Sequence, residues 1–155
     1  MNEIERKFLV KSDKFKEEAQ KKISIQQAYL NTDPARTIRV RTTGDKAYLT
    51  IKGKSNKSGT SRFEWEKEIP LEEAKELLKI CEPGKIVKER YLVSSGRHTF
   101  EVDVFLEALE GLIIAEVELQ DENDEFEIPS WLGKEVTGDV NYYNSRLVEK
   151  AAQKG

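Results

Sequence analysis

Pairs of equal charges separated by one residue recur along this sequence, as in Glu3-Ile4-Glu5, Arg39-Val40-Arg41 and Glu116-Val117-Glu118. In an extended strand, side chains two positions apart lie on the same face. Each pair therefore places like charges side by side, which is unfavourable unless an opposite charge lies between them. Carboxylates and cations gathered in this way suit a site that holds divalent metal ions together with a polyanion.

The paired positions, with Lys7 and Lys52 on the same strand faces, supply both kinds of charge. The carboxylates are Glu3, Glu5, Glu64, Glu66, Glu101, Asp103, Glu116 and Glu118, and the cations are Lys7, Arg39, Arg41, Lys52, Lys88 and Arg90. Carboxylate ligands favour Mg²⁺, Mn²⁺ or Ca²⁺. A zinc cluster of cysteines and histidines is not expected, because Cys81 and His98 are the only residues of these types.

Composition excludes several other classes of protein. Charged residues make up 35% of the 155 residues, yet the net charge is only −3, so no extended face for nucleic acid is expected. The hydrophobic share of 37% is enough for a folded core. No apolar run approaches the roughly 18 residues of a membrane span, and the N-terminus lacks a signal-peptide core. We expect one domain over residues 1–155, located in the cytoplasm, with neither nucleic acid nor membrane as a partner.

Alternating polar and apolar residues predict eight strands. The runs are Glu3–Val10, Ile23–Leu30, Thr37–Thr43, Lys46–Lys54, Arg62–Ile69, Ile86–Val93, His98–Phe105 and Leu112–Gln120. Short turns such as Gly44-Asp45 join several of them, which indicates antiparallel neighbours. Helical spacing predicts a helix from Pro70 to Cys81, a second from Ser12 or Asp13 to about Lys22, and a third over Asn144–Gln153. Asp121–Pro129 is expected to be a loop.

The predicted fold class is α+β, mainly β, but periodicity alone leaves two architectures open. In one, an open antiparallel sheet exposes its polar face to water and packs its apolar face under helices. In the other, the eight strands close into a barrel, whose interior is wide enough for side chains or one small ligand. With the charged face inward, the barrel becomes a polar tunnel, and the peripheral helices cover its apolar exterior.

The charged pairs also carry a resemblance to a known family. Glu3-Ile4-Glu5-Arg6-Lys7 resembles the Glu-x-Glu-x-Lys signature of the CYTH domain, or triphosphate tunnel metalloenzyme, superfamily. The resemblance continues in order through Arg39–Arg41, Thr50–Lys52, Glu64–Glu66, Lys88–Arg90, Glu101–Asp103 and Glu116–Glu118, and then through Trp131–Asp139 and Tyr142–Asn144. The chain looks most like the small stand-alone bacterial tripolyphosphatases of that superfamily. The resemblance implies the eight-stranded antiparallel tunnel rather than the open sheet.

The resemblance further implies roles for individual residues. Glu3, Glu5 and Glu118 look like the main metal ligands, with Glu116, Glu101 and Asp103 on the same acidic side. The implied cofactors are Mg²⁺ or Mn²⁺, two ions with substrate. Lys7, Arg39, Arg41, Lys52, Lys88 and Arg90 look like the cradle for a linear triphosphate, and Glu64 and Glu66 are supporting carboxylates.

Tyr29 and Lys52 resemble a catalytic tyrosine–lysine pair. A tyrosine acts as a base only as the phenolate, which a neighbouring lysine cation favours. The alternative is that Tyr29 only packs in the tunnel and Lys52 only binds phosphate.

The implied activity is metal-dependent hydrolysis of the terminal phosphoanhydride of a linear triphosphate, with inorganic tripolyphosphate as the leading substrate. A nucleoside or thiamine triphosphatase or an adenylyl cyclase uses the same tunnel. A non-catalytic polyphosphate- or nucleotide-binding module keeps the cations but can lose the carboxylates. Both sets of charges are present in this chain, which favours an enzyme, and we expect a monomer or a homodimer.

Overall fold

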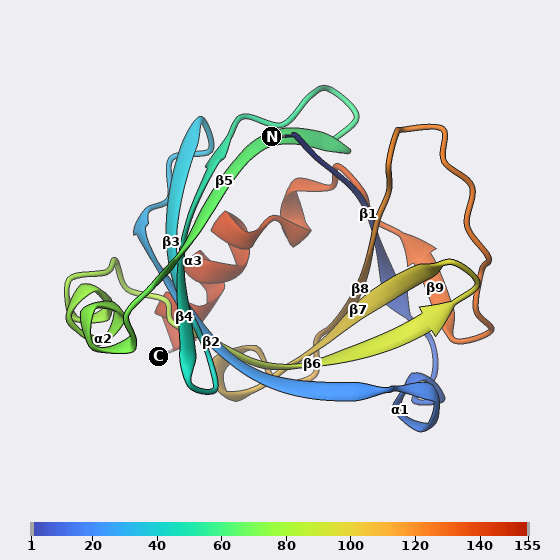
Figure 1. The fold of residues 1–155 in the computed structure, drawn as a ribbon, viewed down its shortest axis with the longest axis horizontal. Helices are drawn as coiled ribbons and strands as arrows, with labels where there is room; N and C mark the ends of the chain where they lie inside the picture. Colours follow the sequence, from blue (N-terminus) through green and yellow to red (C-terminus); the bar gives the residue numbers. More distant parts are fainter. Residues whose placement is uncertain (1, 155) are drawn as a thin grey trace.

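The computed structural model describes residues 2–154, which form nine strands and three α-helices (Figure 1). In chain order they are β1 (Asn2–Val10), α1 (Phe15–Glu18), β2 (Lys21–Asn31), β3 (Arg36–Thr43), β4 (Lys46–Gly53), β5 (Ser61–Ile69), α2 (Leu71–Lys79), β6 (Ile86–Ser95), β7 (His98–Phe105), β8 (Ile113–Glu118), β9 (Leu132–Glu135) and α3 (Asn144–Lys154). Two short 3₁₀ turns lie at Glu107–Leu109 and Val140–Tyr142.

Eight strands close into an antiparallel barrel, which confirms the tunnel architecture and excludes the open sheet. The sheet order is β5-β4-β3-β2-β6-β7-β8-β1-β9, and an additional pairing of β1 with β5 joins its two sides. That seam is short: Asn2, Glu3 and Ile4 lie opposite Phe63, Arg62 and Ser61. Farther along β1, residues Glu5–Leu9 pair with β8, and β9 adds a ninth strand beside the end of β1. Figure 1 shows the resulting ring of strands.

Apolar side chains pack outside the strands in three clusters, each of which includes part of one helix. The first lies around Phe15 of α1 and Trp131, and the second packs Ala74 of α2 against β3 and β4. In the third, Leu147 and Val148 of α3 contact the ends of β2 and β6–β8. In Figure 1, α3 lies across one end of the ring of strands. The strand alternation therefore leaves the polar face to the interior, as expected.

The helices agree only in part with the sequence prediction. The third begins at Asn144 as expected, and α2 lies within the predicted Pro70–Cys81 segment. The prediction of a helix to about Lys22 was wrong: α1 ends at Glu18, and the backbone is extended at Ala19. Lys21 and Lys22 instead pair with β6, and this tertiary pairing overrides the local helical preference. No helix within residues 2–154 has the length and apolar character that a membrane crossing requires.

The last strand, β9, was not predicted. It has only four residues and contains Gly133, so it shows no alternating pattern. A Cβ atom at Gly133 would lie 2.9 Å from the carbonyl oxygen of Leu9, so a side chain there would crowd β1. The segment 121–129 contains neither strand nor helix, as expected.

Candidate active site

The barrel interior holds a cavity of about 190 Å³ that is lined almost entirely by charged side chains. The lining consists of Glu3, Glu5, Arg39, Arg41, Lys52, Glu64, Glu66, Lys88, Arg90, Glu101, Glu116, Glu118 and Asn144. The structure thus brings together most of the site residues predicted from the sequence. Lys7, Asp103 and Tyr29 are the predicted residues outside this lining.

Strand register explains how charges distant in the sequence meet. Glu5 lies opposite Glu118 across β1 and β8, and Lys52 lies opposite Glu64 across β4 and β5. On the other side of the barrel, Arg90 of β6 lies opposite Asp103 of β7. Because every pair is antiparallel, the inward positions of neighbouring strands stay aligned along the barrel.

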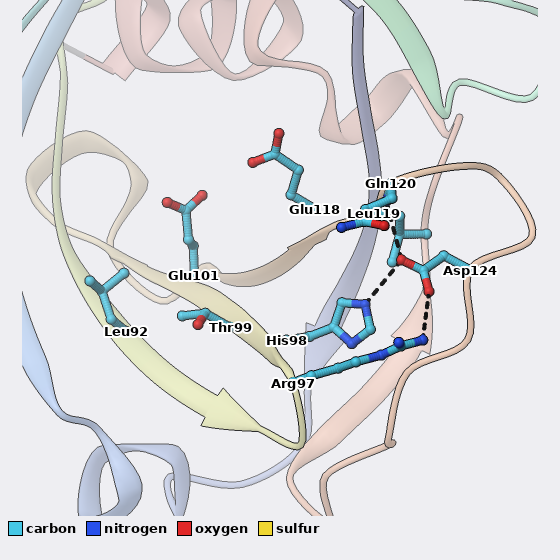
Figure 2. Close-up of a pocket in the computed structure, with 9 residues that line it drawn as sticks. All are labelled: Leu92, Arg97, His98, Thr99, Glu101, Glu118, Leu119, Gln120 and Asp124. Atoms are coloured by element: carbon cyan, nitrogen blue, oxygen red, sulfur yellow. Dashed lines mark hydrogen bonds and ion pairs between the residues drawn. The ribbon is translucent and has the colours of Figure 1, made fainter.

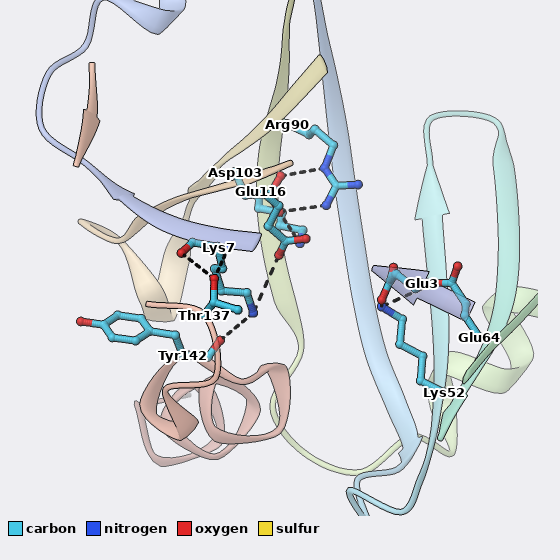
Figure 3. Close-up of polar contacts among 10 residues, drawn as sticks. Glu3, Lys7, Lys52, Glu64, Arg90, Asp103, Glu116, Thr137 and Tyr142 are labelled. Carbon is cyan, nitrogen blue, oxygen red and sulfur yellow. Dashed lines mark hydrogen bonds and ion pairs between the residues drawn. The ribbon is translucent and has the colours of Figure 1, made fainter. Parts of the chain in front are cut away.

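Lys52 lies between two carboxylates. Its Nζ atom is 2.8 Å from Glu3 Oε1 and 3.5 Å from Glu64 Oε2 (Figure 3). Burial disfavours the charged lysine, but the carboxylates of Glu3 and Glu5 hold the pKa of Lys52 above its usual value. Burial and the charge of Glu3 raise the pKa of Glu64. Lys52 is therefore a cation that bridges Glu3 of β1 and Glu64 of β5 on the acidic side of the cavity.

Arg39 and Arg41 of β3 are hydrogen-bonded to neutral side chains, and Nη2 of Arg39 also lies 3.6 Å from Glu66 Oε2. Arg39 donates from Nη2 to Thr50 Oγ1 at 3.3 Å, and Thr50 donates in turn to Glu66 Oε2 at 2.6 Å. Arg41 donates from Nε to Gln27 Oε1 at 2.9 Å. Within residues 2–154, Nε of Arg39 is a buried donor without an acceptor. A buried N–H group without an acceptor costs free energy, so Nε of Arg39 is available to donate to an additional anionic group.

Asp103 forms a buried cluster with Lys88 and Arg90. One oxygen lies 2.7 Å from Nζ of Lys88, and the two oxygens accept from Nε and Nη2 of Arg90 at 2.7 and 2.9 Å. Burial alone would raise the pKa of Asp103, but the two cations hold it well below its usual range. Burial and the nearby arginines lower the pKa of Lys88 to about 7. Both oxygens of Asp103 are thus occupied by cations, unlike those of the carboxylates that line the cavity.

Two carboxyl groups, those of Glu5 and Glu116, lie close together where β1 and β8 meet. Glu5 is hydrogen-bonded to Glu116, and burial together with the charges of Glu116 and Glu3 raises the pKa of Glu5 well above its usual value. Burial opposes the charge of Glu116, but Lys7 and the hydrogen bond from Glu5 lower its pKa to about 2. Nζ of Lys7 lies 3.9 Å from Glu116 and donates to the carbonyl of Tyr142 at 3.1 Å (Figure 3).

These carboxylates have the donor chemistry that a hard divalent cation requires. A divalent cation bound by Glu5 and Glu116 relieves the repulsion between the two carboxylates. In the part of the chain that the structure describes, no three acidic, histidine or cysteine side chains already converge on one point. The acidic side therefore fits Mg²⁺ or Mn²⁺ in ligand type, with pairs of carboxylates as the starting arrangement.

Tyr29 lies at the edge of this arrangement. Its side chain is 3% exposed and packs with Ile86 and Leu147 in the cluster under α3. It lines a neighbouring pocket together with Lys52, so the two residues of the predicted catalytic pair do share one space. The packing and catalytic roles of Tyr29 are both compatible with this position.

Three residues at the cavity were not predicted as site residues from the sequence. Gln27 accepts from Arg41 and Thr50 accepts from Arg39, and Asn144 reaches the cavity from the start of α3. Gln27 lies two positions before Tyr29, and Thr50 two positions before Lys52, so their place on the inward face was a usable signal. Asn144 begins a helix, and strand periodicity could not reveal it.

The end of the barrel away from α3 opens into a wider pocket of about 490 Å³ (Figure 2). Glu101 and Glu118 point into the barrel there, and His98 and Arg97 lie at the rim. Asp124 joins the rim residues: its Oδ2 is 3.2 Å from Nε2 of His98, and its Oδ1 is 3.4 Å from Nη2 of Arg97. The carboxylates of the tunnel are therefore accessible from this end.

Comparison with known proteins agrees with this architecture. The CYTH domain model matches residues 1–151. The chain is 49% identical over 148 residues to a protein of Acetivibrio thermocellus named inorganic triphosphatase, covering 95% of this chain and 93% of that one. It is 36% identical over 155 residues to an inorganic triphosphatase of Nitrosomonas europaea, covering 95% and 97%. A crystal structure of the inorganic triphosphatase NE1496 superposes with a TM-score of 0.66 at 32% identity, covering 94% and 96%. A charged tunnel, a family match across the chain and these relatives together show that the protein belongs to the CYTH family.

Proposed function

We propose that this protein is a metal-dependent inorganic triphosphatase that hydrolyses the terminal phosphoanhydride of tripolyphosphate inside the barrel. One observation carries the proposal: one cavity inside the closed barrel is lined by both a cationic and a carboxylate set in a CYTH chain. The names of the relatives from A. thermocellus and N. europaea support the same activity. A short polyanion fits a cavity of about 190 Å³, which leaves no space for a folded nucleic acid.

The basic side chains would hold the phosphates. Arginine suits this role because its planar guanidinium can contact two phosphate oxygens at once, whereas lysine supplies a compact charge. Nε of Arg39, which lacks an acceptor within residues 2–154, supports a role for this residue as a phosphate ligand. We assign the cradle to Lys7, Arg39, Arg41, Lys52, Lys88 and Arg90. Phosphoryl transfer depends mainly on such positioning and charge neutralisation.

The acidic side would hold the metal. We assign Glu3, Glu5 and Glu118 as main ligands of Mg²⁺ or Mn²⁺, with Glu116 and Glu101 available for a second ion. When bound, such ions neutralise charge on phosphate oxygens and acidify water. For Asp103 we propose a positioning role in place of metal ligation, because Lys88 and Arg90 already occupy its oxygens. Glu64 and Glu66 hold Lys52 and Thr50 in place.

Tyr29 and Lys52 are proposed as the catalytic pair. They line one pocket beside the tunnel, so a water molecule there can contact the phenol oxygen while Lys52 contacts a phosphate. A general base of this kind contributes typically 10²–10⁴-fold to rate.

A substrate panel tests the proposal. Tripolyphosphate, pyrophosphate, thiamine triphosphate and ATP are assayed for orthophosphate release with Mg²⁺ or Mn²⁺. We expect tripolyphosphate to be the preferred substrate and Arg39→Ala to abolish turnover. The matched control is Lys67→Ala, which changes an exposed residue next to the inward Glu66 of β5 and leaves activity unchanged. Release from none of the four compounds would refute hydrolysis, and formation of cyclic AMP from ATP would identify a cyclase.

A further inference from the structure

A second cavity of about 240 Å³ adjoins the tunnel near the start of α3. We call it the annex. Lys52 and Asn144 line both cavities, so the two spaces meet at these side chains. Tyr29 and Arg62 line the annex from the ends of β2 and β5, and Lys54 lines it from the loop that follows β4. The volume far exceeds the roughly 30 Å³ that one liquid water occupies, so the annex can hold a hydrated polyatomic ion.

The annex differs from the tunnel in its charge. Its described lining contains cations but no carboxylate, whereas the tunnel combines cations with several glutamates. Within residues 2–154, neither Lys54 nor Arg62 forms an ion pair, and Arg62 donates only to the carbonyl of Gly53 at 3.2 Å. Glu3 lies opposite Arg62 across β1 and β5, but no carboxylate of the described residues lies within ion-pair distance of Lys54 or Arg62. A concave surface with a single sign of charge raises the local concentration of the opposite ion.

The start of α3 adds to this field. Tyr143 and Asn144 line the annex, and the helix continues from Asn144 to Lys154. The N-terminal end of a helix of this length carries partial positive charge from its free amide groups. The annex thus combines two unpaired cationic side chains with the positive end of a helix.

We propose that the annex is a subsite for one phosphate group next to the bond that is cleaved. This inference rests on the proposed function, because it takes Tyr29 and Lys52 as the place of cleavage. Two sources share the ligand chemistry: orthophosphate released by hydrolysis, and the fourth phosphate of a linear chain longer than tripolyphosphate. Both are tetrahedral oxyanions that Lys54 and Arg62 can contact by charge-assisted hydrogen bonds.

Lys54→Gln tests the proposal, and Lys57→Gln is its matched control, because Lys57 is an exposed lysine of the same loop outside the annex lining. Two quantities are measured in the presence of Mg²⁺: the inhibition constant of inorganic phosphate, and the ratio of kcat/KM for tetrapolyphosphate to that for tripolyphosphate. Loss of one charge-assisted hydrogen bond corresponds to about tenfold. We expect Lys54→Gln to weaken phosphate inhibition or lower the substrate ratio by about tenfold, and Lys57→Gln to change neither.

The two measured quantities distinguish the two sources of the phosphate group. A change confined to phosphate inhibition identifies released product as the ligand, and a change confined to the ratio identifies the fourth phosphate of a longer chain. Arg62→Gln, checked for an unaltered thermal unfolding midpoint, should give the same result as Lys54→Gln. If both quantities match the wild-type values in both variants, the annex is not a phosphate subsite.

Direct binding separates this proposal from the proposed function. Titration of the full-length chain with inorganic phosphate by calorimetry requires no turnover. A wild-type protein that hydrolyses no triphosphate would refute the proposed function, while weaker phosphate binding by Lys54→Gln than by Lys57→Gln would still support the annex. Equal phosphate binding by the two variants, together with an unchanged ratio of kcat/KM values, would refute it.

Discussion

The buried cluster of Lys88, Asp103 and Arg90 offers a quantitative test of how the barrel tolerates its charged interior. Asp103→Asn preserves the shape of the side chain but removes the negative charge that two cations share. Asp103 is 3% exposed, so water cannot replace the lost charge. We expect the free energy of unfolding to fall by about 3–5 kcal/mol near neutral pH, which is the usual cost of removing one partner from a buried ion pair.

The separation of the charges supports this magnitude. At an effective dielectric constant of about 20, two unit charges 2.7 Å apart attract by about 6 kcal/mol, and desolvation offsets part of that. A domain has a total stability of about 5–15 kcal/mol, so the variant should still fold. For a chain of this size, the expected loss lowers the thermal midpoint by about 10 °C.

The pH dependence of the loss has a definite sign. The native pKa of Lys88, lowered to about 7, lies below its unfolded value, so Lys88 is a cation at pH 6 and neutral at pH 9. Without Asp103 its native pKa falls further, so the native variant binds fewer protons than native wild type between these values. The difference in unfolding free energy between the two proteins therefore shrinks as pH rises.

Urea unfolding at pH 6 and pH 9, followed by tryptophan fluorescence, measures this difference. Asp45→Asn, in the exposed turn between β3 and β4, is the control and should change stability little. A loss below about 1 kcal/mol at pH 6, or a loss that grows toward pH 9, would show that the cluster does not hold the interior in the way described.

Three further predictions concern catalysis and the ninth strand. Glu5→Gln should lower kcat/KM for tripolyphosphate at least 100-fold, because the substitution removes a carboxylate that we assign as a main metal ligand. Full activity at saturating Mg²⁺ would exclude Glu5 as a ligand. Tyr29→Phe should lower kcat by about 100-fold and remove the limb of the pH–rate profile that belongs to the base, and an unchanged rate and profile would leave Tyr29 only its packing role. Glu135→Gln should cost about 1 kcal/mol in urea unfolding at pH 7, because Glu135 accepts two hydrogen bonds from Arg6 at 2.6 and 2.8 Å at a partly exposed site. The pKa of Glu135 is lowered in the folded state, so this cost is fully present above the unfolded pKa and should disappear as pH falls through the folded pKa; a cost that stays constant throughout the acid titration would contradict the ion-pair explanation.

Local patterns predicted the strands and their charged faces well, because both depend on neighbours two positions apart. Glu3 and Glu5 show this: their spacing alone placed them on one face, and both line the cavity. Closure of the barrel was a different matter. Closure depends on the pairing of Asn2–Ile4 with Ser61–Phe63. Alternation of polar and apolar residues gives no information about a pairing between segments so far apart in the sequence. The family resemblance, rather than periodicity, distinguished the barrel from the open sheet.

The same limit applies within the site. Glu101 and Asp103 form one pair in the sequence, yet only Glu101 lines the cavity. The difference arises from the neighbouring strand, where Lys88 and Arg90 enclose Asp103. The segment after Ser12 has the composition of a helix, but only Phe15–Glu18 is helical, because Lys21 and Lys22 pair with β6. Composition and spacing do not contain information about such neighbours.

The short seam of the barrel also sets the order in which the protein can assemble. Strands β2–β5 join through short turns and can pair as they are synthesised, whereas β1 must wait for β5, β8 and β9. Pairings between the two ends of a chain form late and slow folding. Glu3, Glu5 and Lys7 lie on this late strand, so the charges of β3–β8 can be in place before these three side chains join them. Until β1 docks, the unfinished barrel is a groove that is open along its seam, and the metal side gains Glu3 and Glu5 only when β1 pairs with β5 and β8.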